Sequence, residues 1–401
     1  MTAPWLHIVG IGADGLAGLG EAARAAIASA ELLVGGERHL AMVPGGEAER
    51  LAWRSPLGAT IAEIERHRGR RVVVLASGDP MNYGVGATLL RSFPLAETRI
   101  MPAVGAFSLA AARLGWPLQE ASCLSLHGRP LDRLARYLSD GARLLALTDD
   151  GAAPPRIAGW LDARGWGPSR LTLLENLGGA DERIIAAPAD AFPTGPAADL
   201  NILAIECRAA AETPVRSRLA GLPDAAFRHD GQLTKAEIRA VTLAALAPMR
   251  GETLWDIGAG CGSIAIEWLR ATDGAAYAIE QNEARPALIT ENAAGLGVPE
   301  LAIIVGTAPA ALADLPVPDA IFIGGGVETV LLAACRDALR PGGRLVANTV
   351  TVEGEAVLHQ FIARQGGTLT RLAISRAEPA GAHLIWRALA PVTQLAWRKA
   401  R

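Results

Sequence analysis

A glycine-rich turn preceded by an acidic residue is the first stretch of this sequence whose residue types could carry chemistry. Residues 256–262 read DIGAGCG and lie between the apolar stretch TLW and the helix-like stretch SIAIEWLRA. The glycines of this turn alternate, at Gly258, Gly260 and Gly262. The dinucleotide fingerprint G-x-G-x-x-G needs its third glycine where this chain has Ser263. The turn therefore predicts a nucleotide-like ligand that is not held as a dinucleotide.

Two carboxylates near this turn indicate the charge of that ligand. Asp256 ends the strand before the turn, where a negative charge disfavours a pyrophosphate and suits a cation or zwitterion. Glu280 ends the next predicted strand, where a carboxylate can accept both ribose hydroxyls. NAD enzymes also place an acid there, so Glu280 alone does not discriminate. S-adenosylmethionine (SAM) carries a sulfonium, an ammonium and no phosphate, and the combination of Asp256 and Glu280 favours it.

Composition removes other classes of enzyme. The chain has 401 residues, and only Lys235 and Lys399 among its 38 basic residues are lysines. A pyridoxal enzyme needs a Schiff-base lysine and a P-loop needs Gly-Lys, a pair that this chain lacks. The four cysteines are scattered singly and no H-E-x-x-H occurs, so we expect no metal site.

Charge and hydropathy limit the expected partners. The formal net charge is -3 and no polybasic block occurs, so we expect no nucleic-acid partner. Uncharged apolar stretches stay shorter than the ~18 residues of a membrane span, and the first residues lack a basic n-region. We therefore expect a cytoplasmic protein without a membrane partner.

Apolar stretches of strand length alternate with helical patterns, which predicts an α/β protein with mostly parallel sheets. In the first half the predicted strands are 6–12, 71–77, 123–128, 143–148, 170–176 and 201–207, with a helix at 106–115. An Ala/Arg-rich stretch with two prolines follows. The sequence thus predicts a first domain at 1–209, a linker at 210–222 and a second domain at 223–401.

The second half has a more regular rhythm. Its seven predicted strands are 252–258, 275–280, 301–306, 319–325, 343–350, 368–375 and 382–389. The stretch between the last two, RAEPAG, is too short for a helical crossover. We therefore expect these two strands to be antiparallel.

The second half also resembles a known family, the decarboxylating precorrin methyltransferase domain of cobalamin synthesis. Generic methyltransferases share DIGAG, but not HDGQLTK at 229–235 together with FIGGG at 322–326. The resemblance begins at about residue 221. It implies that SAM contacts Thr234, Gly258, Ala259, Gly260, Cys261, Gly262, Glu280 and Ala308, to which the charge argument adds Asp256.

Three motifs stand out in the first half: VGIGADG at 9–15, SGDPMNYG at 77–84 and PAVGAF at 102–107. Through them this half resembles the tetrapyrrole methylases, a different SAM-binding fold with the cofactor between two α/β lobes. It implies SAM contacts at Ala13, Ser77, Gly78, Asp79, Asn82, Gly105 and Ala106. The chain departs from the family at Ala13, where many members have proline, and at Ala103, where many have glycine.

Together the two resemblances imply a fold and an activity. The fold is an N-terminal two-lobed tetrapyrrole methylase (class III SAM methyltransferase) followed by a C-terminal seven-stranded Rossmann-like class I SAM methyltransferase. The first domain is expected to methylate carbon 5 of precorrin-6Y or 6B. The second is expected to methylate carbon 15 and decarboxylate the ring C acetate, giving precorrin-8. SAM at one site per domain, a small-molecule tetrapyrrole substrate and a homo-oligomer are implied.

Polar side chains near the predicted sites are candidates for catalysis. They are His229 and Asp230 before Thr234, Asn348 at the end of a strand, and His127 in the first domain. For each, a solvated or capping role is equally open. The alternative function is an RNA or protein methyltransferase with a non-catalytic N-terminal substrate-binding module. The chain has NTVT at 348–351 in place of N-P-P-[YF], which disfavours methylation of adenine amino groups.

Overall fold

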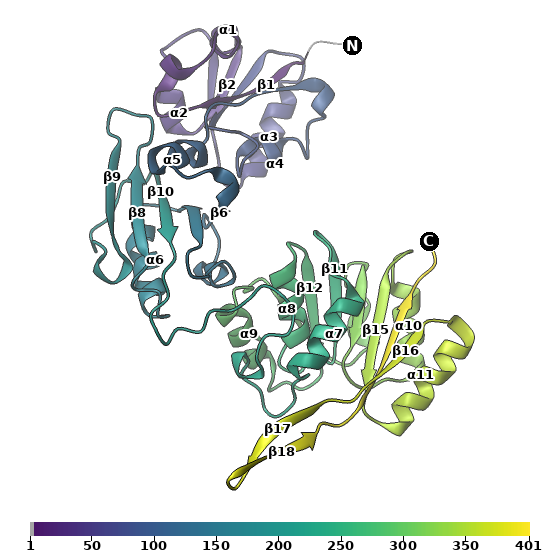
Figure 1. Cartoon of the computed structure of the whole chain (residues 1–401). Coiled ribbons are helices and arrows are strands. Elements are labelled where there is room, and N and C mark those ends of the chain that lie inside the picture. The colour runs from purple at the N-terminus through teal and green to yellow at the C-terminus, as the bar shows by residue number, and fades with distance from the viewer. Residues whose placement is uncertain (1–3) are drawn as a thin grey trace. The chain divides into compact units, whose positions relative to one another are not determined.

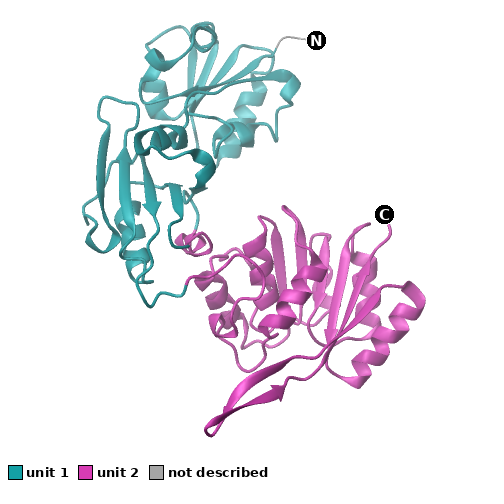
Figure 2. Ribbon diagram, viewed as in Figure 1, with its two compact units in different colours: residues 1–129, 139–214 teal, residues 130–138, 215–401 magenta. Residues whose placement is uncertain are grey.

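The computed structural model describes residues 4–401, which form two compact units (Figure 2). Unit 1 contains the chain up to residue 129 and residues 139–214. Unit 2 contains residues 130–138 and 215–401. The short segment 130–138, which lies within the predicted first domain, therefore belongs to the second unit.

The first sheet of unit 1 is parallel, with the strand order β3-β2-β4-β1-β5. Its strands are β1 (Leu6–Ile11), β2 (Leu32–Gly35), β3 (Glu49–Ala52), β4 (Val72–Ser77) and β5 (Thr98–Met101). Its helices are α1 (Glu21–Ala28), α2 (Glu37–Ala41), α3 (Leu57–Arg66) and α4 (Val85–Leu89) (Figure 1). Successive strand residues face opposite sides. Ile8 therefore packs in the cluster of Ile64 on α3, and Val9 in that of Ile27 on α1.

The second sheet of unit 1 has the order β6-β7-β10-β8-β9. Its strands are β6 (Ala121–Ser125), β7 (Arg143–Leu147), β8 (Arg170–Glu175), β9 (Arg183–Pro188) and β10 (Asn201–Glu206). The helices here are α5 (Ala106–Leu114) and α6 (Ala153–Asp162). Phe107 of α5 packs with Leu145 and Leu174 of this sheet.

The expectation of mostly parallel sheets is wrong for this second sheet. β6 and β7 are parallel, but β7, β10, β8 and β9 pair antiparallel in that order. Residues 176–182 connect β8 to β9 without a helix, which permits only a hairpin. The sequence analysis did not predict β9, whose apolar residues Ile184 to Ala187 are only exposed or half-buried in the structure.

Unit 2 is built on a seven-stranded sheet with the order β13-β12-β11-β14-β15-β19-β16. The strands are β11 (Thr253–Ile257), β12 (Ala275–Glu280), β13 (Ala302–Val305), β14 (Ala320–Ile323), β15 (Arg344–Thr349), β16 (Thr368–Leu372) and β19 (Val392–Arg398). The helices are α7 (Ala236–Leu246), α8 (Ser263–Ala271), α9 (Pro286–Gly295), α10 (Thr329–Ala338) and α11 (Val352–Gln365). Trp268 of α8 and Leu358 of α11 lie in the two separate clusters of buried side chains.

The C-terminal strands differ from the prediction. β19 pairs antiparallel with both β15 and β16, whereas the predicted last strand is β18 (His383–Ala388), outside the sheet. β18 pairs with β17 (Ser375–Ala380), the stretch expected to be a loop, and the two form a separate ribbon (Figure 1). The apolar stretch HLIW of β18 does form a strand, but Trp386 on it is 77% exposed.

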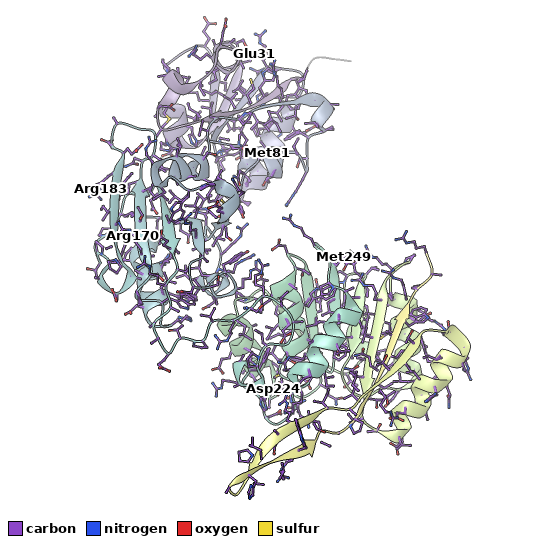
Figure 3. The ribbon with its side chains drawn as sticks, in the orientation of Figure 1. Glu31, Met81, Arg170, Arg183, Asp224 and Met249 are labelled. Atoms are coloured by element: carbon purple, nitrogen blue, oxygen red, sulfur yellow. The ribbon has the colours of Figure 1, made fainter. Side chains whose placement is uncertain are left out.

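Ion pairs hold the base of this ribbon. Arg376 on β17 donates to Asp224, 2.8 Å away, and to Glu237 (Figure 3 labels Asp224). Short 3-10 helices complete both units: η1 (Gly15–Gly18), η2 (Leu95–Glu97), η3 (Leu118–Glu120), η4 (Leu131–Arg136), η5 (Ala189–Ala191), η6 (Asp224–Ala226) and η7 (Ala310–Leu312). No helix within residues 4–401 is both long enough and apolar enough to cross a membrane.

Candidate active sites

A cavity of about 980 Å³ lies in unit 2 beyond the carboxyl ends of β11, β12, β14 and β15. Its lining brings together most of the predicted SAM contacts: Thr234, Asp256, Gly258, Ala259, Gly260, Cys261, Glu280 and Ala308. Gly262 is the predicted contact that does not line it. Four segments far apart in the sequence therefore meet at one edge of the sheet, as parallel strands require.

The glycines of the turn have separate roles. Gly258 and Gly260 have φ angles of +72° and +60°, a region that favours glycine, and they line the cavity. Gly262, with a φ of +80°, precedes α8, and a Cβ there would lie 2.8 Å from Ile289. Gly262 thus permits close packing of α8 against α9 and supports the turn from behind.

The two acidic residues fix the turn through backbone hydrogen bonds. Asp256 is buried and accepts a hydrogen bond from the Ala265 amide of α8 at 2.9 Å. Glu280 is also buried and accepts one from the Gly260 amide at 2.8 Å. Burial, together with the nearby charge of Glu280, raises the pKa of Asp256 to about 7. A cation placed here would stabilise the ionised carboxylates, which fits the sulfonium and ammonium of SAM.

The structure does not bring His229 or Asp230 into the cavity wall. His229 accepts a hydrogen bond from the Gly231 amide through Nδ1, and Asp230 accepts one from the Gln232 amide. Asp230 also pairs with Arg285, with 2.9 Å between the carboxylate oxygen and Nε. Both side chains are exposed and shape a turn, which is the capping role left open above. The cavity is lined instead by residues 231–235.

Asn348 does line the cavity, as part of a buried polar network. Its Nδ2 donates to Thr242 at 2.9 Å, and its Oδ1 accepts from Gln394 Nε2 at 2.9 Å. Gln394 also donates to Thr242. The amide is therefore held in one orientation by α7 and β19, so its first role is to satisfy neighbouring buried groups.

Unit 1 has its own cavity of about 380 Å³ beyond the carboxyl ends of β1, β2 and β4. All the SAM contacts predicted for the first half line it: Ala13, Ser77, Gly78, Asp79, Asn82, Gly105 and Ala106. Side chains of the second sheet, among them Leu147 and Ile202, close its other side. The cavity thus lies between the two sheets of the unit.

Close backbone contacts shape this cavity. A Cβ at Gly10 would lie 1.9 Å from the Gly78 carbonyl oxygen, and Gly78 itself has a φ of +52°. Asp79 accepts a hydrogen bond from the Met81 amide at 2.9 Å, which makes a tight turn and leaves Met81 exposed (Figure 3). The SGDP stretch therefore contributes mainly backbone atoms to the cavity wall, and its one charged side chain is Asp79.

His127 lies outside this cavity. Its exposed ring is 3.3 Å from Asp149, which also accepts a hydrogen bond from the Gly128 amide. Sequence reasoning missed Arg38 and His39, which do line the cavity. Both follow β2, a strand of only four residues that the sequence did not predict, so no sheet edge was available on which to place them. Within the described residues, no group of His, Cys, Asp and Glu side chains could hold a metal ion.

Comparison with known proteins matches the whole chain. A relative from Sinorhizobium sp, named precorrin-6Y C(5,15)-methyltransferase [decarboxylating], is 51% identical over 404 residues, covering 100% of this chain and 97% of the relative. This chain belongs to the precorrin-6Y C(5,15)-methyltransferase (decarboxylating) family. The family description "Tetrapyrrole (Corrin/Porphyrin) Methylases" matches residues 5–193, and "Precorrin methyltransferase domain" matches residues 225–399.

Two further relatives are much shorter proteins. Cobalt-precorrin-7 C(5)-methyltransferase of Salmonella typhimurium is 36% identical, covering 46% of this chain and 92% of the relative. The probable cobalt-precorrin-6B C(15)-methyltransferase (decarboxylating) of Pyrobaculum calidifontis is 33% identical, covering 43% of this chain and 92% of the relative. The first of these relatives is named for a C(5) methylation alone and the second for a C(15) methylation with decarboxylation alone.

Proposed function

We propose that this chain is a SAM-dependent enzyme of cobalamin biosynthesis with two active sites. Unit 1 methylates carbon 5 of the precorrin macrocycle. Unit 2 methylates carbon 15 and removes the carboxyl group of the ring C acetate. The observation that carries the proposal is that each unit has a cavity of its own, lined by its own glycine turns at the ends of parallel strands. The separate C(5) and C(15) relatives support the division of labour.

Each unit is assigned a different methyltransferase fold. The strand order of unit 2, with six strands parallel to one another and the antiparallel β19 inserted next to the edge strand β16, supports a Rossmann-like class I fold. In this fold the acids Asp256 and Glu280 end neighbouring strands at the cofactor. The two sheets of unit 1, with a cavity between them, support the two-lobed class III fold.

The residues of unit 2 fit SAM. When bound, SAM supplies a methyl group carried on a sulfonium cation. Asp256 and Glu280 provide negative charge in a buried site and suit the cationic end and the ribose hydroxyls. The backbone of Gly258 and Gly260 allows close approach because neither has a side chain. Thr234, Ala259, Cys261 and Ala308 complete the wall, and Gly262 acts through packing.

The residues of unit 1 fit the same ligand in another way. Gly78 and Gly105 allow close approach to the backbone, while Ala13 and Ala106 keep the wall small. Ser77, Asp79 and Asn82 supply polar atoms at the same edge. We propose one SAM site in each unit on these grounds.

The proposed reactions need no covalent catalysis by side chains of the protein. A meso carbon of a reduced tetrapyrrole is enamine-like and already nucleophilic, so orientation within each cavity supplies most of the acceleration. Loss of carbon dioxide leaves electrons that the conjugated macrocycle accepts. The task of the protein is to hold the substrate, to exclude water and to set the charge around it.

Self-association is also proposed. Leu384 and Trp386 on β18 are 70% and 77% exposed, which is unusual for large apolar side chains on one strand. Burial of this ribbon against a second copy would cover them. Sedimentation of the purified chain should show an oligomer, and Trp386→Ser should shift it toward the monomer. A monomeric wild-type chain would contradict this.

Calorimetric titration of the full chain with SAM tests the two-site proposal. Two bound SAM molecules per chain are expected. Gly325→Arg fills the unit 2 cavity, since Gly325 lies against Gly258 and a Cβ there meets nothing within 4 Å. This variant should bind one SAM, as should Gly105→Arg in unit 1. The exposed glycines Gly58 and Gly295, where a Cβ also meets nothing, give control variants Gly58→Arg and Gly295→Arg that should keep both sites. A wild-type stoichiometry of one would overturn the proposal.

A further inference from the structure

Arg38 is a cation in the unit 1 cavity without an acidic partner. It lies on α2, directly after β2, and it is the only arginine or lysine in the cavity lining. Within the described chain its hydrogen bonds go to two neutral groups, His39 Nε2 at 2.8 Å and Ser77 Oγ at 3.4 Å. Other arginines of this unit pair with carboxylates, as Arg113 does with Glu182 and Arg183 with Glu175. Partial burial lowers the pKa of Arg38, and no neighbouring carboxylate counters the effect.

His39 holds this arginine as a neutral acceptor. The Arg38 guanidinium can only donate, so His39 Nε2 acts as the acceptor. The proton of the neutral ring is then on Nδ1, a buried atom that has no hydrogen-bond partner within the described residues. Burial, with the charge of Arg38, lowers the pKa of His39 to about 4, which keeps the ring neutral at physiological pH. Ser77 Oγ lies 3.0 Å from the same Nε2. His39 and Ser77 thus form a fixed polar support beneath one nitrogen of the guanidinium.

The support leaves the rest of the guanidinium free. Both hydrogen bonds use Nη2 of Arg38, and neither uses Nη1 or Nε. Each of these nitrogens can still donate a charge-assisted hydrogen bond to a carboxylate oxygen. The substrate class of the proposed function carries several acetate and propionate side chains, and SAM carries one carboxylate. The single cation of the cavity is therefore complementary in charge to the carboxylates of these ligands.

We propose that Arg38 binds a carboxylate of the ligand in the unit 1 cavity, and that His39 and Ser77 position its guanidinium. This inference rests on the proposed function of unit 1. The shared chemistry is a carboxylate paired with a guanidinium, from either the macrocycle or the methionine part of SAM. Arg38 is the binding residue, and His39 acts through it as a positioning residue.

The test compares full-length variants in two assays. Arg38→Gln removes the charge, and Arg38→Lys keeps the charge without the guanidinium group. Arg91→Gln is the control, because Arg91 is exposed and does not line the cavity. SAM affinity is measured by calorimetry in the Gly325→Arg background, which leaves only the unit 1 site to titrate. The KM and kcat of carbon-5 methylation are measured with the precorrin substrate by mass spectrometry of the product.

If Arg38 binds a carboxylate of the macrocycle, Arg38→Gln should raise the KM for the precorrin about 10- to 100-fold and leave the SAM affinity unchanged. This is the range for the loss of a charge-assisted pair. If Arg38 binds the carboxylate of SAM, the same variant should lower the SAM affinity by that factor instead. Arg38→Lys should lie between Arg38→Gln and wild type in either case. If Arg38→Gln matches Arg91→Gln in both assays while the wild type methylates carbon 5, Arg38 does not bind a carboxylate. If the wild type itself neither binds SAM in unit 1 nor methylates carbon 5, the proposed function fails first.

Variants of His39 separate positioning from general stability. His39→Gln keeps a hydrogen-bond acceptor for Arg38, whereas His39→Leu removes it. His39→Leu should raise the same constant as Arg38→Gln with little change in kcat, and His39→Gln should restore part of the loss. In the Arg38→Gln background His39→Leu should add no further loss. An equal added loss in both backgrounds would show that His39 does not act through Arg38.

Discussion

Unit 1 and unit 2 both place a glycine-lined cavity beyond the carboxyl ends of parallel strands, but the charges at the two cavities differ. In unit 2 the acids Asp256 and Glu280 are buried at the turn, where Glu280 also pairs with Arg285. In unit 1 the corresponding edge carries Arg38 and a neutral His39, while Asp79 is engaged by the Met81 amide. Two sites proposed for one cofactor can thus share glycine turns while one of them adds buried carboxylates and the other does not.

The largest expected effect is the loss of the buried charge in unit 2. Asp256→Asn keeps an acceptor for the Ala265 amide but removes the charge that faces a cationic ligand. It should weaken SAM binding in unit 2 by about 100-fold, the scale for losing one partner of a buried charge pair. Asp79→Asn in unit 1 should change affinity by less than about threefold. Calorimetry checks both, and equal losses in the two units would remove the electrostatic distinction.

A dependence of SAM affinity on pH should follow in unit 2 only. The pKa of Asp256 is raised from 3.8 to about 7 in the ligand-free chain, and a bound cation lowers it again. Below about pH 7, the affinity of unit 2 for SAM should fall about tenfold per pH unit, with release of a proton on binding. Titrations in buffers of different ionisation enthalpy measure that proton. A unit 2 affinity that is flat between pH 5 and pH 7 would contradict a raised pKa.

The same carboxyl affects folding with a defined sign. Because its pKa is higher in the folded chain than the unfolded value of 3.8, it favours folding most at low pH. That contribution is fully present below about pH 4 and is lost as the pH rises through about 7. Denaturation of ligand-free Asp256→Asn should therefore depend less on pH in this window than the wild type does.

A smaller effect, on stability, is expected from the buried asparagine that lines each cavity. Asn348 in unit 2 and Asn201 in unit 1 each line a cavity, and each is held by a buried hydroxyl, Thr242 and Thr148 respectively. Replacement by alanine leaves the partners unpaired and should cost about 1–3 kcal/mol of unfolding free energy in each unit. Urea denaturation measures this. If Asn348→Ala remains folded at the assay temperature and its kcat still falls, Asn348 contributes to catalysis as well as to stability.

The smallest effects are expected at the exposed histidines. His229 and His127 lie outside the two cavities and make local contacts with Gly231 and Asp149. His229→Asn and His127→Asn should each change kcat by less than about twofold, because surface contacts of this kind contribute little. Product formation by mass spectrometry checks them. A tenfold loss in either variant would mean that its loop contributes to the reaction.

The glycine turns and their acids could be predicted because the residues that line each site are adjacent or nearly adjacent in the sequence. DIGAGCG and SGDP each keep their ligand-facing atoms within one short stretch, and all their residues except Gly262 and Pro80 line a cavity. Arg38 and His39 could not be found in this way. They reach the site through β2, four residues long, whose place depends on pairing with β3 and β4.

The C-terminal strands could not be predicted for a related reason. The apolar stretch of β18, from Leu384 to Trp386, looks the same in the sequence whether the strand joins a core sheet or stands alone, so the exposure of Trp386 cannot be read from it. The inner place of β19 depends on its register with β15, in which Gln394 lies opposite Asn348. Such long-range pairings are set by tertiary packing and not by local sequence.

Product analysis of two blocked full-length variants tests the central claim, that each unit carries one methylation. With SAM and the precorrin substrate, Gly105→Arg should yield a macrocycle that has gained one methyl group and lost one carboxyl group. Gly325→Arg should not yield the doubly methylated, decarboxylated product, and an equimolar mixture of both variants should restore it. A doubly methylated product from Gly105→Arg alone, or a mixture that restores nothing while each variant remains folded, would contradict the assignment of one reaction to each unit.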